Sequence, residues 1–245
     1  MPNASHSSHD SDHLAVDRVV VVIPAHNERD LLPSCLRAVR IAADAVPVPV
    51  HVGVVLDTCT DGSAEVIGAE VAPIVGEFGA VGAARAAGIA ALLHDASSET
   101  DPERTWVATT DADSEVPGNW LQRHLTRAAE GALAYAGTVT PKDWTRWPAA
   151  LADRYRRRYR DHDGHRHIHG ANLGVRADAY LAVGGFGELP HDEDVDLIER
   201  LESAGVSIAW CAQAPVATST RRHGRAPEGF AAHLRSLSTT GRRSA

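Results

Sequence analysis

The most regular hydrophobic pattern begins with a continuous apolar run at residues 19–23, which ends at Pro24. An uninterrupted run of β-branched residues is typical of a strand that is buried on both faces of a parallel sheet. After it, apolar residues recur at helical spacing at Leu31, Leu32, Cys35, Leu36 and Val39. A second β-branched run covers residues 51–56. The succession of strand, helix and strand predicts a parallel βαβ unit.

Two further segments continue this alternation. Residues 79–93 are Ala-rich and predict a helix, and residues 105–110 predict another strand, which stops at an acidic loop. The alternation predicts a doubly wound α/β domain whose mixed, mostly parallel sheet is flanked by helices. We expect a single domain over residues 18–236, with a disordered leader over residues 1–17 and a flexible tail over residues 237–245.

The second half of the chain has a less regular pattern. Residues 137–139 fit the end of a strand, and residues 206–211 fit another strand. Between them, one face of a basic helix is marked by Trp144, Trp147, Leu151, Tyr155 and Arg158. Such a stripe can pack on the sheet. It can also give residues 144–160 a peripheral contact with a membrane surface or a lipid-linked acceptor.

Composition narrows the class of protein. Hydrophobic residues make up 44% and charged residues 23% of the chain, which is typical of globular proteins. The formal net charge of -8 argues against binding to nucleic acid, because that affinity comes from neutralising phosphates. The three cysteines have no CxxC spacing, which argues against a disulfide framework or a structural zinc site. Unpaired cysteines of this kind fit a reducing compartment, so we expect a cytoplasmic protein. No apolar stretch approaches the ~20 residues that span a bilayer.

Three loops that follow predicted strands are rich in polar side chains. They cover residues 24–28, 57–63 and 111–115. In doubly wound sheets, ligands bind beyond the carboxyl ends of the strands, so these loops are expected to meet at one site. Their Asp, Asn, Glu and hydroxyl groups suit hydrogen bonding to a ribose, a base edge or a hydrated cation.

The acidic triplet Asp111-Ala112-Asp113 follows the predicted strand at residues 105–110. Both carboxylates can approach one hard cation, and oxygen ligands of this kind favour Mg²⁺ or Mn²⁺. No GxGxxG follows the first strand and no GxxxxGK[ST] occurs, which argues against a dehydrogenase and a P-loop kinase. A bound diphosphate would be neutralised by a cation on Asp113, with help from an arginine such as Arg85 or Arg222.

Several motifs follow one another along the chain. They are Pro24-Ala25-His26-Asn27-Glu28, residues 56–63, residues 82–88, the acidic triplet, residues 170–173 with 184–186, and residues 191–197. In this order they resemble the motifs of the family 2 glycosyltransferases, a GT-A group that uses nucleoside diphosphate sugars as donors. The resemblance covers roughly residues 19–234 and implies the GT-A fold.

The resemblance also implies which residues bind the donor. The first turn would hold the nucleoside, Asp57 would contact the base, and Asp111 would face the ribose. Asp113 would hold the metal. The residues that would bind the nucleotide sugar in this way are Pro24, Ala25, Asn27, Glu28, Asp57, Arg85, Asp111 and Ala112. In some relatives, a late histidine completes the metal shell or a late arginine holds the diphosphate, and His223 and Arg222 are the candidates here.

The chain departs from the family pattern at two places. Leu56 replaces the first Asp of the usual pair, and Thr58-Cys59 replaces Gly-Ser, so the base pocket differs from that of common uridine-nucleotide users. The Gln-x-x-Arg-Trp motif of processive synthases is absent. This absence favours the transfer of a single sugar residue.

The catalytic base can be argued from helical spacing. If a helix begins at Asp192, then Asp194 shares one face with Leu197, Ile198 and Leu201 and points inward. The pKa of a carboxylate on the buried side can be tuned, as a general base requires. For Asp192 and Glu193, a favourable interaction with the helix dipole is a sufficient explanation. Asp194 is therefore the predicted base.

The predicted function is that of a metal-dependent, hexosyltransferase-type enzyme. It would move one sugar from a nucleoside-diphosphate sugar to a hydroxyl of a small or lipid-linked acceptor, with inversion. Retaining enzymes share the fold, so retention stays open. A nucleotidyltransferase and a catalytically inactive GT-A module that binds a nucleotide are the two alternatives. The sequence specifies no oligomeric state.

Overall fold

The computed structural model of the chain describes residues 15–94, 101–222 and 230–239. Short 3-10 turns lie at Ser63–Val66, Pro102–Arg104 and Gly170–Asn172. The helices and strands, in chain order, are β1 (Arg18–Ala25), α1 (Leu32–Asp44), β2 (Val50–Asp57), β3 (Val71–Gly76), α2 (Val81–Leu93), β4 (Thr105–Thr109), β5 (Ser114–Glu115), α3 (Trp120–Ala129), β6 (Ala134–Pro141), α4 (Ala149–Arg158), β7 (Leu173–Arg176), α5 (Ala177–Ala182), α6 (Glu193–Ser203), β8 (Ile208–Thr218) and α7 (Phe230–Thr239).

The strands form one mixed sheet in the order β3-β2-β1-β4-β7-β6-β8-β5. The predicted βαβ unit is confirmed, because β1 and β2 pair in parallel through Val19↔Val50 to Ala25↔Leu56. Strand β4 adds to the other edge of β1, also in parallel. Strand β7 then runs antiparallel to both of its neighbours, β4 and β6. The carboxyl ends of β1, β2 and β4 therefore lie along one edge of the sheet.

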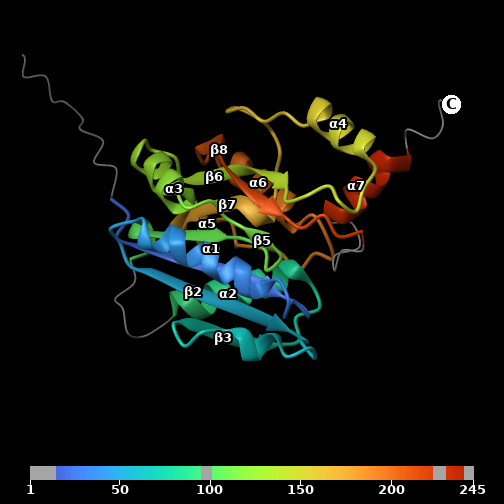
Figure 1. Cartoon of the computed structure of the whole chain (residues 1–245). Coiled ribbons are helices and arrows are strands. Elements are labelled where there is room, and N and C mark those ends of the chain that lie inside the picture. Colours follow the sequence, from blue (N-terminus) through green and yellow to red (C-terminus); the bar gives the residue numbers. More distant parts are fainter. Residues whose placement is uncertain (1–14, 95–100, 223–229, 240–245) are drawn as a thin grey trace, which may run out of the picture.

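Helices cover both faces of this sheet. This burial on both sides explains why residues 19–23 of β1 are all apolar. Val19, Val21 and Ile23 pack in one buried cluster with residues of α1 and α3. Val20 and Val22 pack in a second cluster with residues of α2 and α6. Successive side chains of a strand point to opposite faces, so the middle of a strand that is covered on both sides is apolar on both faces. In Figure 1, the blue and cyan elements from the first half of the chain form one side of the molecule.

Helix α2 approaches the sheet closely at Gly88. A Cβ at this position would lie 2.6 Å from methyl groups of both Val22 and Val55. The missing side chain therefore lets the helix settle onto β1 and β2, and glycine is needed here for packing. Glycine otherwise weakens the interior of a helix.

The boundaries of the later elements differ from those predicted. Strand β8 runs from Ile208 to Thr218, well beyond the predicted end at residue 211. Strand β3 was not predicted, because it is an edge strand that contains Pro73 and has few buried positions. Helix α7 ends at Thr239, three residues beyond the predicted domain boundary.

The aromatic stripe predicted at residues 144–160 is packed inside the protein. Helix α4 begins only at Ala149, so Trp144 and Trp147 precede it. The side chains that it shares with α7 in a small separate core are Trp147, Leu151, Tyr155, Leu234 and Leu237. Figure 1 shows α4 and α7 together at one corner of the molecule, away from β2 and β3. Within the described residues, no helix combines the length and the apolarity required to cross a membrane.

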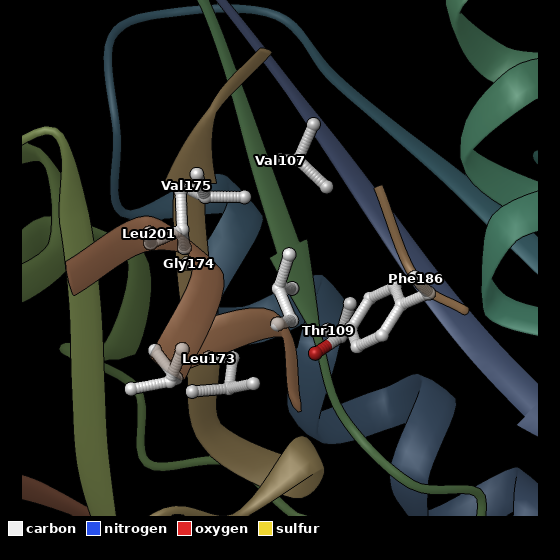
Figure 2. A pocket seen from close by; sticks show the side chains of 9 residues that line it. Val107, Thr109, Leu173, Gly174, Val175, Phe186 and Leu201 are labelled. Atoms are coloured by element: carbon white, nitrogen blue, oxygen red, sulfur yellow. The ribbon is translucent and has the colours of Figure 1, made fainter. Parts of the chain in front are cut away.

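A small apolar cavity lies between the sheet and α6. Figure 2 shows Phe186 and Thr109 on one side of it and Val175 and Leu173 on the other. The cavity is lined by Val107, Thr109, Leu173, Gly174, Val175, Phe186, Leu197, Ile198 and Leu201. The lining has no charged group, so this cavity is a feature of core packing. The polar groups that could bind a ligand or take part in a reaction lie elsewhere, at the strand ends.

Candidate functional site

The first two polar loops are tied to each other where β1 and β2 end. Asn27 has a positive φ of 55°, and its side-chain oxygen accepts the N–H of Thr60 at 2.8 Å. The N–H of Glu28 donates to Ser63 Oγ at 2.9 Å. Pro24 and Ala25 are the last two residues of β1. The four predicted nucleoside-binding residues thus stand on a turn that the second loop holds in place.

Asp57 ends β2 and fixes the segment that follows β3. Its Oδ1 accepts the N–H of Phe78 at 2.8 Å, and its Oδ2 accepts the N–H of Gly79 at 3.2 Å. The side chain is half-buried. Asp57 therefore lies at the predicted place beside the first turn. Its carboxylate accepts hydrogen bonds from these two backbone amides.

The acidic triplet follows β4 and divides its two carboxylates between two arginines. Asp111 Oδ1 accepts a hydrogen bond from Arg85 Nη2 at 2.6 Å. Asp113 Oδ2 lies 3.1 Å from Arg221 Nη2. Ala112, between them, is buried at 2% exposure. Strand β5, which begins directly after the triplet, pairs antiparallel with the end of β8 through Ser114↔Thr218. This pairing brings the loop that follows β8 against the triplet.

Arg221, which was not predicted from the sequence as a site residue, joins two of the acidic motifs. Its Nη1 lies 2.7 Å from Glu28 Oε1 and 2.9 Å from Glu28 Oε2, and its Nη2 reaches Asp113. Arg222, which was predicted from the sequence to help hold the diphosphate, does not contact these acids. Arg222 Nε instead donates to the carbonyl of Arg146 at 2.9 Å, and its guanidinium lies 5.3 Å from the ring centre of Trp147. His223, the predicted metal ligand, lies outside the described residues.

Arg221 neutralises Asp113 only in part. Burial and the negative charge of Asp111 raise the pKa of Asp113 to about 7. The charge of Glu28 acts in the same direction, and Arg221 opposes it. A carboxylate in such surroundings gains from a nearby cation.

Arg85 is buried at 3% exposure and connects the triplet to the start of α6. Its Nη1 donates to Glu193 and its Nη2 to Asp111. A Cβ on Gly170 would lie 2.5 Å from the same guanidinium, so the Gly170 turn packs directly against it. Residues from three distant motifs therefore meet at one buried cation.

Asp194, the predicted base, lies beside this cluster. Its Oδ2 accepts the N–H of Gly170 at 2.7 Å, and its Oδ1 accepts the N–H of Val195 at 2.9 Å. Burial raises the pKa of Asp194 above its ordinary value, while Arg85 and the Gly170 amide oppose this shift. A raised pKa brings a carboxylate closer to the range in which it accepts a proton efficiently near neutral pH.

Glu193 was assigned only a dipole interaction by the sequence analysis, and that interpretation was incomplete. The structure buries Glu193 at 5% exposure and pairs it with Arg85. The signal for this was present in the sequence, because residues 193, 197 and 201 also share one helical face. The signal for Arg221 was weaker: it adjoins Arg222, and the pattern alone does not say which of two neighbours points inward.

The carboxylate groups of the site are suitable ligands for a hard divalent cation. Glu28, Asp111 and Asp113 offer carboxylate oxygens, which Mg²⁺ and Mn²⁺ prefer. Within residues 15–94, 101–222 and 230–239, no three His, Cys, Asp or Glu side chains gather closely enough to enclose a metal ion. Mg²⁺ is usually held by one or two carboxylates together with substrate phosphates, so Asp113 and a bound diphosphate would fit such an ion.

Comparison with known proteins gives two kinds of similarity. The family model "Glycosyl transferase family 2" matches residues 20–183. The structure is similar to S. aureus TarS 1-349 in complex with UDP-GlcNAc, with a TM-score of 0.62 and 12% identity over 91% of this chain and 66% of that one. The chain thus spans just under two thirds of the length of that relative.

A second similar structure is the mannosyltransferase PcManGT from Pyrobaculum calidifontis in complex with GDP-Man and Mn2+. It has a TM-score of 0.61 and 18% identity, over 96% of this chain and 66% of that one. No curated protein matches the sequence significantly.

Proposed function

The chain belongs to glycosyltransferase family 2 and has the GT-A fold, and on this premise we propose that it transfers one sugar from a nucleoside diphosphate to an acceptor hydroxyl. The observation that carries this proposal is that the acidic triplet and the start of α6 both contact Arg85. Asp111 of the donor side and Glu193, next to the base candidate, bind the same buried guanidinium. Donor and acceptor would therefore react within one site.

The donor would lie along the ends of β1, β2 and β4. The turn at Pro24, Ala25, Asn27 and Glu28 and the carboxylate of Asp57 would hold the nucleoside, and Asp111 would hold the ribose. TarS and PcManGT were each solved with a nucleoside diphosphate sugar, which supports this class of donor. Arg85 and Ala112 are buried behind these groups, so their proposed role in nucleotide binding is to position Asp111 and the triplet.

Mn²⁺ or Mg²⁺ would bind through Asp113, with His223 as a proposed further ligand. When bound, such an ion neutralises charge on the leaving diphosphate. The Mn2+ in the PcManGT structure supports the choice of ion. Arg221 is the arginine best placed to help hold the diphosphate, because its guanidinium already reaches Asp113.

Asp194 would act as the general base. The acceptor oxygen forms a bond to the anomeric carbon, the bond from that carbon to the diphosphate oxygen breaks, and the acceptor proton passes to Asp194. A single displacement of this kind inverts the anomeric configuration. The backbone amides of Gly170 and Val195 hold the carboxylate of Asp194 in one orientation. The anomeric configuration of the product, measured by NMR, tests inversion against retention.

The substitution Asp194→Asn tests the assignment of the base. It should lower kcat by roughly 10²- to 10⁴-fold, the usual contribution of a positioned base, while donor affinity is kept. Glu199→Gln is the matched control, because Glu199 lies on the same helix and its side chain is exposed. Turnover is measured as release of nucleoside diphosphate, and donor binding by calorimetry. A near-normal rate for Asp194→Asn would exclude Asp194 as the base.

We also propose a small or lipid-linked acceptor and a cytoplasmic location. Cys35, Cys59 and Cys211 are all free thiols, which is the usual state in a reducing compartment. Because the aromatic stripe of residues 144–160 is buried, a peripheral contact with a membrane or a lipid-linked acceptor would depend on the exposed arginines of this segment.

A further inference from the structure

Arg221 occupies the space between the two carboxylates nearest to the proposed metal position. It pairs with both oxygens of Glu28 at 2.7 and 2.9 Å and with Oδ2 of Asp113 at 3.1 Å. The Glu28 and Asp113 side chains are only 7% and 15% exposed. The guanidinium thus holds two poorly solvated acids from different motifs.

The chain fixes Arg221 in this place from both sides. The end of β8 pairs with β5, directly after the acidic triplet, and Ser114 Oγ donates to Thr218 Oγ1 at 3.0 Å. Trp147 Nε1 donates to the carbonyl of Thr220 at 2.7 Å, which anchors the residue before Arg221. Arg222 turns the other way, towards Trp147. Of the two neighbouring arginines, only Arg221 meets the acids.

A divalent cation on Asp113 would compete with Arg221 in its present position. Both would use the same carboxylate, and two positive groups a few ångströms apart in a partly buried site repel strongly. A diphosphate changes this balance, because its oxygens accept hydrogen bonds from a guanidinium and also bind the metal. The incoming donor can therefore take Arg221 from the acids while it brings the cation.

We propose that Arg221 is a built-in counter-ion of the Glu28–Asp113 pair when no donor is bound, so that the divalent cation binds more tightly together with the diphosphate than alone. This proposal rests on the proposed function, and it specifies how the donor and the cation affect each other's binding at that site. Arg221 exchanges Glu28 and Asp113 for the diphosphate as the cation takes its place on Asp113.

Binding of Mn²⁺ alone provides the first test. Free Mn²⁺ is measured by electron paramagnetic resonance in the wild-type protein and in the variants Arg221→Gln, Arg221→Lys and Arg222→Gln, without nucleotide. Arg221→Gln should bind Mn²⁺ about tenfold more tightly than wild type, because the competing charge is gone. Arg221→Lys keeps the charge and Arg222→Gln leaves the acids untouched, so both should stay close to wild type. Thermal unfolding verifies that each variant is folded.

Addition of UDP or GDP provides the second test. Either nucleotide that binds should tighten Mn²⁺ binding in the wild-type protein, and it should do so much less in Arg221→Gln. An Arg221→Gln variant whose Mn²⁺ affinity without nucleotide equals that of wild type would overturn the counter-ion role and leave the proposed function standing. Absence of Mn²⁺ binding in every protein, with either nucleotide, would overturn both the counter-ion role and the proposed metal site.

Discussion

At the scale of single residues, buried polar side chains join parts of the chain that are far apart in sequence. Asn172 is fully buried, and its Nδ2 donates to the carbonyls of Thr138 at 2.8 Å and Ala214 at 3.0 Å. Its Oδ1 accepts a hydrogen bond from Trp120 Nε1 at 2.9 Å. The segment around Asn172 was identified by its resemblance to a family motif, and the structure shows that it also ties β6 and β8 together.

Burial of His124 should make the free energy of unfolding depend on pH. Burial lowers its pKa from 6.5 to about 3, and its Nδ1 accepts a hydrogen bond from Trp106 Nε1 at 3.1 Å. Below pH 6.5 the unfolded chain binds a proton at His124 that the folded protein excludes. The free energy of unfolding should therefore fall with decreasing pH between about 6.5 and 3, by up to about 1.4 kcal/mol per pH unit.

The substitution His124→Gln isolates this effect, since glutamine can also accept the Trp106 bond and does not titrate. Urea unfolding at pH 7.5, 6 and 5 should show that the stability gap between wild type and His124→Gln narrows as pH falls, by roughly 2 kcal/mol in total. His94→Gln serves as the control, because His94 is exposed. A constant gap for His124→Gln would contradict the assignment.

The site residues that could be predicted from the sequence are those that follow a strand or lie on one face of a helix. Asp111, Asp113 and Asp57 follow apolar runs, and their places in the structure agree with those expected from the parallel strands. Arg221 was not predicted, because the direction of a side chain in an irregular loop depends on contacts from elsewhere in the chain. Here that direction comes from the β5–β8 pairing and from Trp147.

At the scale of elements, the first half of the fold was more predictable than the second. Strands β1 and β4 are buried at nearly every position, so the central residues of both are apolar. Strand β8 alternates between buried and half-exposed positions over its second half and includes Gln213 and Pro215. Its length is set by pairing with β6 and β5, which are distant in sequence and leave no local pattern.

Helix α2 offers a test of packing against intrinsic helix propensity. Gly88→Ala replaces a poor helix former with the best one, which by itself would add about 1 kcal/mol of stability. The new methyl group would meet Val22 and Val55 at 2.6 Å, so we expect a net loss of about 1 to 3 kcal/mol in the free energy of unfolding. Urea denaturation measures it.

The matched control for that prediction is Ala90→Gly, two residues further along the same helix at an exposed position. It should cost about 1 kcal/mol through propensity alone. A gain in stability for Gly88→Ala would show that the helix can move away from the sheet without penalty.

At the scale of the whole molecule, charge is distributed unevenly. The chain has a formal net charge of -8, yet residues 144–160 contain six arginines and one aspartate. The apolar side of this segment packs on α7, and Arg156, Arg157 and Arg158 are exposed at the end of α4. The molecule therefore presents a basic corner on an otherwise acidic protein.

This basic corner predicts weak, salt-sensitive binding to anionic membranes without insertion of aromatic side chains. The protein should sediment with phosphatidylserine vesicles at low ionic strength and remain in solution with phosphatidylcholine vesicles. Arg157→Gln with Arg158→Gln should weaken this binding about tenfold. Arg37→Gln with Arg40→Gln removes the same charge from the exposed face of α1 and should have little effect. Equal losses for the two pairs would exclude α4 as the contact.

The crowding of acids at the site has a consequence for how this sequence can evolve. The buried guanidinium of Arg85 and the half-buried one of Arg221 face five carboxylates, those of Glu28, Asp111, Asp113, Glu193 and Asp194. Two guanidinium groups do not neutralise five carboxylates, so part of the repulsion among these acids remains. Selection for stability alone would therefore favour their neutral replacements, and only selection for activity can keep them in the sequence.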